Sequence, residues 1–193
     1  MDTTKDEREI KFFDTASKFE AWLKKNHSSS KGVWLHFYKK GSGVKSLNHA
    51  GALDVALCYG WIDAVANKYD DTSYLQRFTP RRPKSIWSKK NIDNTNRLIE
   101  AGKMKASGLK AIEEAKADGR WEAAYDSPTN STIPPDFLKA LKKDKTAYKF
   151  FKTLNKTNTF AITWRLQTAK KPETREKRMK TILAMLAEGK AFH

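Results

Sequence analysis

The feature that most constrains the fold is a six-residue stretch, Val33 to Tyr38, that reads VWLHFY. Valine, leucine and phenylalanine occupy alternate positions, and tryptophan, histidine and tyrosine occupy the positions between them. Both faces of a strand built from these residues are therefore apolar. Because a strand with two apolar faces needs cover on both sides, the chain is predicted to build a sheet that is packed by helices.

Two further segments complete the predicted sheet. Residues 62–68 and 74–79 are strand-like, and they are separated by Asp70-Asp71-Thr72-Ser73. Asp and Ser side chains bond to nearby backbone groups and favour turns, so the two segments are predicted to form a hairpin. Pairing with residues 33–38 gives a small three-stranded antiparallel sheet. Residues 1–11 are charged and are predicted to be a loose lead-in.

The remaining segments are predicted to be helical. Helical spacing of apolar residues indicates helices over 15–26, over 47–60 with a stop at Gly60, from Ser88 to about Gly102, and over 106–117. The stretch SPTNSTIPP at 127–135 is the one linker-like segment. Three or four helices follow it, one carrying Phe160 and Trp164 four residues apart and the last opening at Pro172.

The predicted fold class is therefore α+β: a small three-stranded antiparallel sheet packed by helices, followed by an all-helical C-terminal unit. The predicted domains are residues 1–126, which contain a basic arm at 77–91, and residues 134–193. Apolar residues make up 39% of the chain and aromatic residues 11%, enough for a packed core.

Charge restricts the partners. The formal net charge is +16, from 38 Lys and Arg against 22 Asp and Glu. A field of this sign attracts polyanions, anionic head groups and phosphorylated metabolites, without choosing among them. The predicted partner is an anionic ligand or polyanion, with a small anion favoured and nucleic acid as the alternative. High lysine content also serves plain solubility.

The stretch most informative about function runs from Thr79 to Asn91 and reads TPRRPKSIWSKKN. It contains five basic residues and no acid, and its two prolines keep the first half extended. Ser88 stands where the N-cap of the next helix is expected, and a helix N-terminus favours an anion. The alternative is a solvated basic loop that Trp87 anchors to the core. The predicted anion-binding residues are Arg81, Arg82, Lys84, Ser85, Trp87, Ser88 and Lys89, with Asp63 and Trp61 beside them.

Asp63 closes the motif Gly60-Trp61-Ile62-Asp63, in which a helix stops and feeds a strand. A carboxylate at such a junction can be partly buried and poised for chemistry. The more ordinary role, and the one favoured, is an ion pair with Arg81 or Arg82. Both interpretations predict that Asp63 lies near the basic arm.

Catalytic machinery is not recognisable in the sequence. The histidines, His27, His36, His49 and His193, share no ligand spacing with one another or with Cys58, so neither a metal nor a cofactor is predicted. Cys58 is the single cysteine and lies in an apolar helix end, where inert packing is favoured. GxSxG, Walker A and GxGxxG motifs are absent. Catalytic residues are unknown, and whether the chain is an enzyme is left open.

Two further observations concern location and the C-terminal part. No run approaches the roughly 18–20 apolar residues of a membrane span, and the N-terminus lacks the apolar core of a secretory signal, so a soluble, cytoplasmic protein is expected. In the stretch 171–178, Glu173 and Lys177 form a helix-supporting pair, which leaves Arg175 and Arg178 free to face an anion. Oligomeric state is not predicted.

Several of these motifs together resemble the YdeI/OmpD-associated family, also called bacteriocin-protection proteins. They are GVWLHFYKK, ALCYGWID, FTPRRPKSIWSKKN, LIEAGKMKASGLKAIEEAKADGRW and KKPETREKR, which follow one another from about residue 12 to 188. Alanine stands at 64 where the resemblance predicts glycine. The resemblance implies tolerance of cationic antimicrobial peptides and association with an outer-membrane porin. It implies no reaction, cofactor or catalytic residue.

The charge limits how such a role would work, because a protein of charge +16 repels cationic peptides and will not sequester them. Protection would instead act on an anionic target, or indirectly through stress regulation. The predicted function is that of an anion-binding stress or peptide-tolerance protein. The alternatives are a nucleic-acid-binding module and a cryptic enzyme acting on a phosphorylated or carboxylated substrate.

Overall fold

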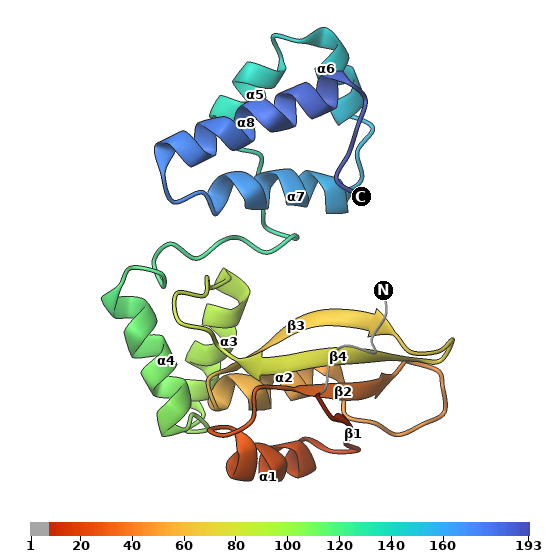
Figure 1. The fold of residues 1–193 in the computed structure, drawn as a ribbon, viewed down its shortest axis with the longest axis vertical. Helices are drawn as coiled ribbons and strands as arrows, with labels where there is room; N and C mark the ends of the chain where they lie inside the picture. Colours follow the sequence, from red (N-terminus) through yellow and green to blue (C-terminus); the bar gives the residue numbers. More distant parts are fainter. Residues whose placement is uncertain (1–7) are drawn as a thin grey trace. The chain divides into compact units, whose positions relative to one another are not determined.

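A computed structural model describes residues 8–193 (Figure 1). The chain forms two compact units, one comprising Met1–Ser85 with Asn91–Glu122, and the other comprising Ile86–Lys90 with Ala123–His193. The chain therefore passes from one unit to the other within the basic arm, between Ser85 and Ile86. The predicted division into domains 1–126 and 134–193 stays a prediction.

The first unit is built on a mixed sheet of four strands. The strands are β1 (Ile10–Phe12), β2 (Val33–Tyr38), β3 (Trp61–Lys68) and β4 (Ser73–Pro80), in the order β1-β2-β4-β3. The β2–β4 and β3–β4 pairs are antiparallel, as predicted, whereas β1 pairs with β2 in parallel. The α+β class is confirmed. The prediction of a three-stranded, purely antiparallel sheet is wrong, because β1 adds a fourth strand that is parallel to β2.

The short length of β1 explains why the sequence did not predict it. The strand has three residues, of which Ile10 and Phe12 are about half exposed, and three residues are too few for their alternation to indicate a strand. It is held by backbone pairing of Ile10 with Trp34 and of Phe12 with His36. An edge strand of this kind depends on its partner, because its own side chains bury little area.

One face of β2 is fully covered. Helices α1 (Ala16–Asn26) and α2 (His49–Cys58) contribute to one core cluster together with Val33, Leu35 and Phe37 of β2. These three side chains are at most 2% exposed. The predicted packing of helices on the sheet is confirmed on this face (Figure 1).

The opposite face of β2 is covered less completely. Trp34 is buried, and the Arg77 guanidinium lies 5.5 Å from its ring centroid. His36 and Tyr38 are half-buried and form a ring cluster with the exposed Phe12, whose ring centroid is 5.8 Å from that of Tyr38. Cover is therefore complete on one face of β2 and partial on the other.

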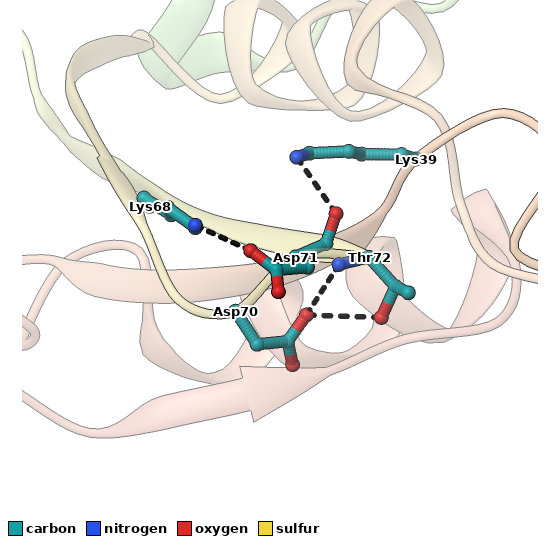
Figure 2. A network of polar contacts seen from close by, with 5 residues as sticks. All are labelled: Lys39, Lys68, Asp70, Asp71 and Thr72. Carbon is teal, nitrogen blue, oxygen red and sulfur yellow. Dashed lines mark hydrogen bonds and ion pairs between the residues drawn. The ribbon is translucent and has the colours of Figure 1, made fainter.

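The predicted turn between β3 and β4 is held by its own side chains, as Figure 2 shows. The Asp70 carboxylate accepts hydrogen bonds from the Thr72 backbone N–H at 2.7 Å and from its hydroxyl at 2.9 Å. Lys68 pairs with the Asp71 carboxylate at 2.5 Å, and Lys39 donates to the Asp71 carbonyl at 2.9 Å. Local polar contacts thus fix the hairpin that positions the start of β4.

Helices α3 (Lys89–Glu100) and α4 (Ala106–Ala117) follow the arm. Helix α4 approaches the end of α2 so closely that a Cβ on Gly108 would lie 2.3 Å from the Cys58 carbonyl oxygen. Glycine at this position lets two helix backbones meet without a side chain between them.

The second unit contains the helices α5 (Pro135–Leu141), α6 (Lys145–Phe151), α7 (Lys156–Gln167) and α8 (Pro172–Ala187). Their core is a cluster of seven buried apolar side chains: Phe137, Leu141, Ala147, Ile162, Leu166, Ile182 and Leu186. Phe160 and Trp164, which are four residues apart on α7, are half-buried, and Ile162 and Leu166 take the core positions. Two aromatic side chains are thus left outside the core of this unit.

Candidate anion-binding site

The basic arm begins as an extension of the sheet. Pro80, the last residue of β4, pairs with Trp61, and the Arg81 backbone N–H donates to the Gly60 carbonyl at 3.0 Å. The Trp61 indole is 1% exposed and donates its N–H to the His27 carbonyl at 3.1 Å. Trp61 therefore anchors the strand beside the arm from within the core.

Residues Arg82 to Ser85 form a tight turn. The Ser85 backbone N–H donates to the Arg82 carbonyl at 3.0 Å, and Lys84 has a φ of 65°. Proline at the second position and a positive φ at the third are the pattern of a type II turn, which usually places glycine where Lys84 stands. A lysine there stores backbone strain, and such strain often accompanies a functional site.

A buried arginine holds the end of this turn. Arg120 is 7% exposed, and its Nη1 donates to the Ser85 carbonyl at 2.9 Å. Its Nε lies 2.7 Å from both carboxylate oxygens of Asp118. The Ser85 hydroxyl is buried, and none of residues 8–193 offers it a hydrogen-bond partner. Arg120 had no predicted role, and the Asp-Gly-Arg sequence that ends α4 gave no signal of this contact.

The second half of the arm is tied into the other unit. Trp87 and Ser88 are buried, and Ser88 forms a parallel bridge with Tyr125, whose N–H donates to the Trp87 carbonyl at 3.1 Å. The Lys89 N–H donates to the Tyr125 carbonyl at 2.9 Å, and its ammonium pairs with Asp126 at 2.7 Å. This ion pair lowers the pKa of Asp126. The predicted start of a helix after Ser88 is confirmed by α3.

Asp63 contacts a histidine, and the favoured ion pair with Arg81 or Arg82 is not formed. Its carboxylate oxygen lies 3.0 Å from Nε2 of His49, the first residue of α2. Among residues 8–193, His49 is the polar partner that the structure gives for the Asp63 side chain. The sequence placed His49 at the start of a helix but gave no sign that the fold brings it to β3.

The predicted residues thus divide between the two units. Arg81, Arg82, Lys84 and Ser85 belong with Asp63 and Trp61 to the first unit, whereas Trp87, Ser88 and Lys89 belong to the second. Arg82 and Lys84 are exposed, and neither side chain makes an ion pair or hydrogen bond with any residue that the structure describes. The Arg82–Ser85 turn therefore presents two cationic side chains that have no ion-pair partner among residues 8–193.

Among residues 8–193, the structure gives little support for a metal site, a reactive thiol or a membrane-spanning helix. Between residues 8 and 193, no group of three or more His, Cys, Asp or Glu side chains could hold a metal ion. Burial raises the pKa of Cys58 to about 11, so its thiolate is scarce at neutral pH. No helix among these residues is both long and apolar enough to cross a membrane.

These observations define an α+β protein with a helical C-terminal unit and a preorganised basic turn. Residues 11–111, just over half of the chain, match the model of a domain of unknown function (DUF8412), and the chain belongs to this family. Residues 130–189 match the model of the bacteriocin-protection, YdeI or OmpD-associated family (OmdA). Neither the curated proteins nor the solved structures gave a match.

The predicted family resemblance is confirmed, over a shorter stretch than the expected 12–188. The motif KKPETREKR lies inside the OmdA match. The motifs around β2, β3 and the basic arm lie in the stretch that matches the domain of unknown function.

Proposed function

We propose that this protein binds a small anion at the Arg82–Ser85 turn. The observation that carries the proposal is a turn fixed by backbone hydrogen bonds whose two cationic side chains, Arg82 and Lys84, have no counter-charge within residues 8–193. The backbone of this turn is already held in place, so anion binding has to order only the two exposed side chains. Charge-assisted hydrogen bonds to phosphate or carboxylate are the strongest that such side chains form.

Two carboxylates of the same unit, Asp63 and Asp118, have other partners, and this supports the proposal. Asp63 contacts His49, and Asp118 pairs with Arg120. Arg82 and Lys84 are the proposed contacts, with Arg81 and Ser85 as positioning residues. A contribution from Trp87, Ser88 and Lys89 stays a prediction.

Calorimetric titration with inorganic phosphate tests the site. Replacing Arg82 and Lys84 together with alanine should weaken binding at least tenfold, because about 1.5–3 kcal/mol is lost for each hydrogen bond to a charged group. The matched control replaces Lys103 and Lys110, two exposed lysines of the same unit, and should bind as the wild type does. Equal loss in both double variants would mean that overall charge, not the turn, attracts the anion.

Salt dependence separates a small-anion site from a nucleic-acid interface. A site with two cations should bind phosphate one to one and weaken modestly between 50 and 200 mM salt. A nucleic-acid interface with six or more phosphate contacts should lose affinity for an oligonucleotide by about 10³ or more over the same range. If affinity for the oligonucleotide falls steeply with salt and phosphate does not bind, the nucleic-acid alternative replaces this proposal.

We also propose a role in tolerance of cationic antimicrobial peptides, which the name of the matched family suggests. With a net charge of +16, the protein would act on the anionic target that such peptides share, rather than on the peptides. Competition for anionic lipid vesicles tests this: added protein should displace a labelled cationic peptide from them. A direct complex of protein and peptide without vesicles would contradict the mechanism.

A further inference from the structure

The helical C-terminal unit contains a pocket of about 450 Å³ between α7, α8 and the residues that follow α8. This volume is within the usual range for small-molecule sites, about 300–1,000 Å³. Its lining combines an apolar wall with cationic and hydroxyl side chains: Trp164, Arg165, Thr174, Lys177, Arg178, Thr181, Ile182 and Phe192. Three of the eight residues are basic, and none of the described residues that line it is acidic.

The two arginines are held in place by neutral acceptors. Arg178 donates through Nη1 to the Arg165 carbonyl at 2.7 Å and to the Thr168 hydroxyl at 3.3 Å. Arg165 donates through Nη1 to the Ala161 carbonyl at 3.1 Å, and its guanidinium carbon lies 3.7 Å from the Phe192 ring centroid. These contacts orient both guanidinium groups without neutralising either charge.

Basic residues of α8 that lie outside the pocket form ion pairs with carboxylates, whereas the two arginines of the pocket do not. Arg175 forms a two-point ion pair with Asp136, at 2.5 and 3.0 Å, and Lys180 pairs with Glu176 at 2.7 Å. Neither Arg165 nor Arg178 pairs with a carboxylate of residues 8–193. Two cations of the pocket are therefore left for a ligand to neutralise.

Partial burial of Arg165, and its repulsion from Arg178, make an anionic ligand more favourable in this pocket. Partial burial lowers the pKa of Arg165, and the nearby charge of Arg178 lowers it further. Like charges brought together in a partly desolvated pocket destabilise one another, and a bound anion relieves that cost. The guanidinium group also matches a carboxylate geometrically, because it offers paired N–H donors in one plane.

The apolar side chains of the pocket favour an apolar group on the ligand, next to its carboxylate. Trp164 and Phe192 are half-buried aromatic residues at the pocket, beside the buried Ile182. An inorganic ion would leave this apolar surface wet, whereas a ring-bearing acid covers it and gains about 25 cal/mol per Å² of buried apolar area. We infer that this pocket is a second binding site, independent of the Arg82–Ser85 turn, for an organic acid that joins a carboxylate to an apolar ring.

Calorimetry with three probes tests the ligand class. The full-length protein should bind 2-naphthoate one to one, and bind the neutral isostere 2-naphthamide and inorganic phosphate at this pocket at least tenfold more weakly. The Arg82→Ala, Lys84→Ala variant removes the proposed turn site, so phosphate binding is measured on that background. Naphthoate affinity should be unchanged there, which keeps this inference separate from the proposed function.

Variants then locate the site. Arg165→Gln keeps an amide donor for the Ala161 carbonyl but removes the charge, so it should weaken naphthoate at least tenfold and leave naphthamide unchanged. Lys180→Gln, on the same helix but outside the pocket, should change neither affinity. If circular dichroism shows that Arg165→Gln does not fold, the exposed Lys177→Gln replaces it, with a smaller loss of naphthoate affinity expected. Equal binding of naphthoate and naphthamide, tighter phosphate binding, or no naphthoate binding would each overturn the inference.

Discussion

The strain at Lys84 gives a direct test of how the arm is organised. A left-handed backbone costs a non-glycine residue about 1–2 kcal/mol, and Lys84 adopts it with φ at 65°. Glycine removes that cost but adds about 0.4–1 kcal/mol of backbone entropy to the unfolded chain. The Lys84 side chain makes no ion pair or hydrogen bond in the part of the chain that the structure describes, so its loss removes no contact. Lys84→Gly should therefore stabilise the protein by about 0.5–1 kcal/mol.

Lys84→Ala is the matched control, since it removes the same charge and keeps the strain. Its stability should lie within about 0.5 kcal/mol of the wild type. Both variants should lose phosphate affinity at least tenfold, because each lacks the ammonium group. In a chain of this length, 1 kcal/mol shifts the melting temperature by about 2–4 °C, so the glycine variant should melt about 1–4 °C higher.

Thermal and urea unfolding, followed by circular dichroism, measure the difference between the two variants. A glycine variant that is no more stable than the alanine variant would refute the strain argument. A glycine variant that is more stable yet binds phosphate normally would keep the strain and refute the role of Lys84 in binding. A gain in stability with a loss of binding is the expected exchange of stability for function.

Three other substitutions probe the contacts around the site. Arg120→Met should destabilise the protein by about 2 kcal/mol in urea, and weaken phosphate binding, because the buried hydrogen bonds of the guanidinium are lost while the stem volume is kept. Gly108→Ala should cost about 2 kcal/mol despite alanine's better helix propensity, because the new Cβ would lie 2.3 Å from the Cys58 carbonyl oxygen; an unchanged melting temperature would contradict this. Lys89→Met should cost about 0.5 kcal/mol at neutral pH, since the lysine is largely exposed. The pKa of Asp126 is lowered in the folded state, so this stability is present above about pH 4 and disappears as the pH falls through the folded pKa; melting curves from pH 7 to pH 2 should show the variant and wild type converging.

Local patterns in the sequence determined the elements that carry their own signal. The alternation in residues 33–38 predicted β2, and the Asp-Ser turn predicted the β3–β4 hairpin, because in each case the responsible side chains are neighbours in the chain. The helix start after Ser88 and the glycine stop at Gly60 were predicted for the same reason. The concentration of cations in the arm was also visible in the sequence, since it depends on composition, whereas the structure showed which of them are unpaired.

Contacts between residues far apart in the chain were decided by the tertiary structure. Strand β1 forms because β2 offers it an edge, and its three residues are too few for a periodic pattern to predict it. Asp63 meets His49, and Arg120 meets Ser85, through packing that brings separate elements together. Arg165 and Arg178 become neighbours because α7 packs on α8, and Trp164 joins their pocket because Ile162 and Leu166 take the core positions. Short-range propensity fixes which segments form, whereas the burial of apolar faces, a property of the whole unit, fixes which side chains meet.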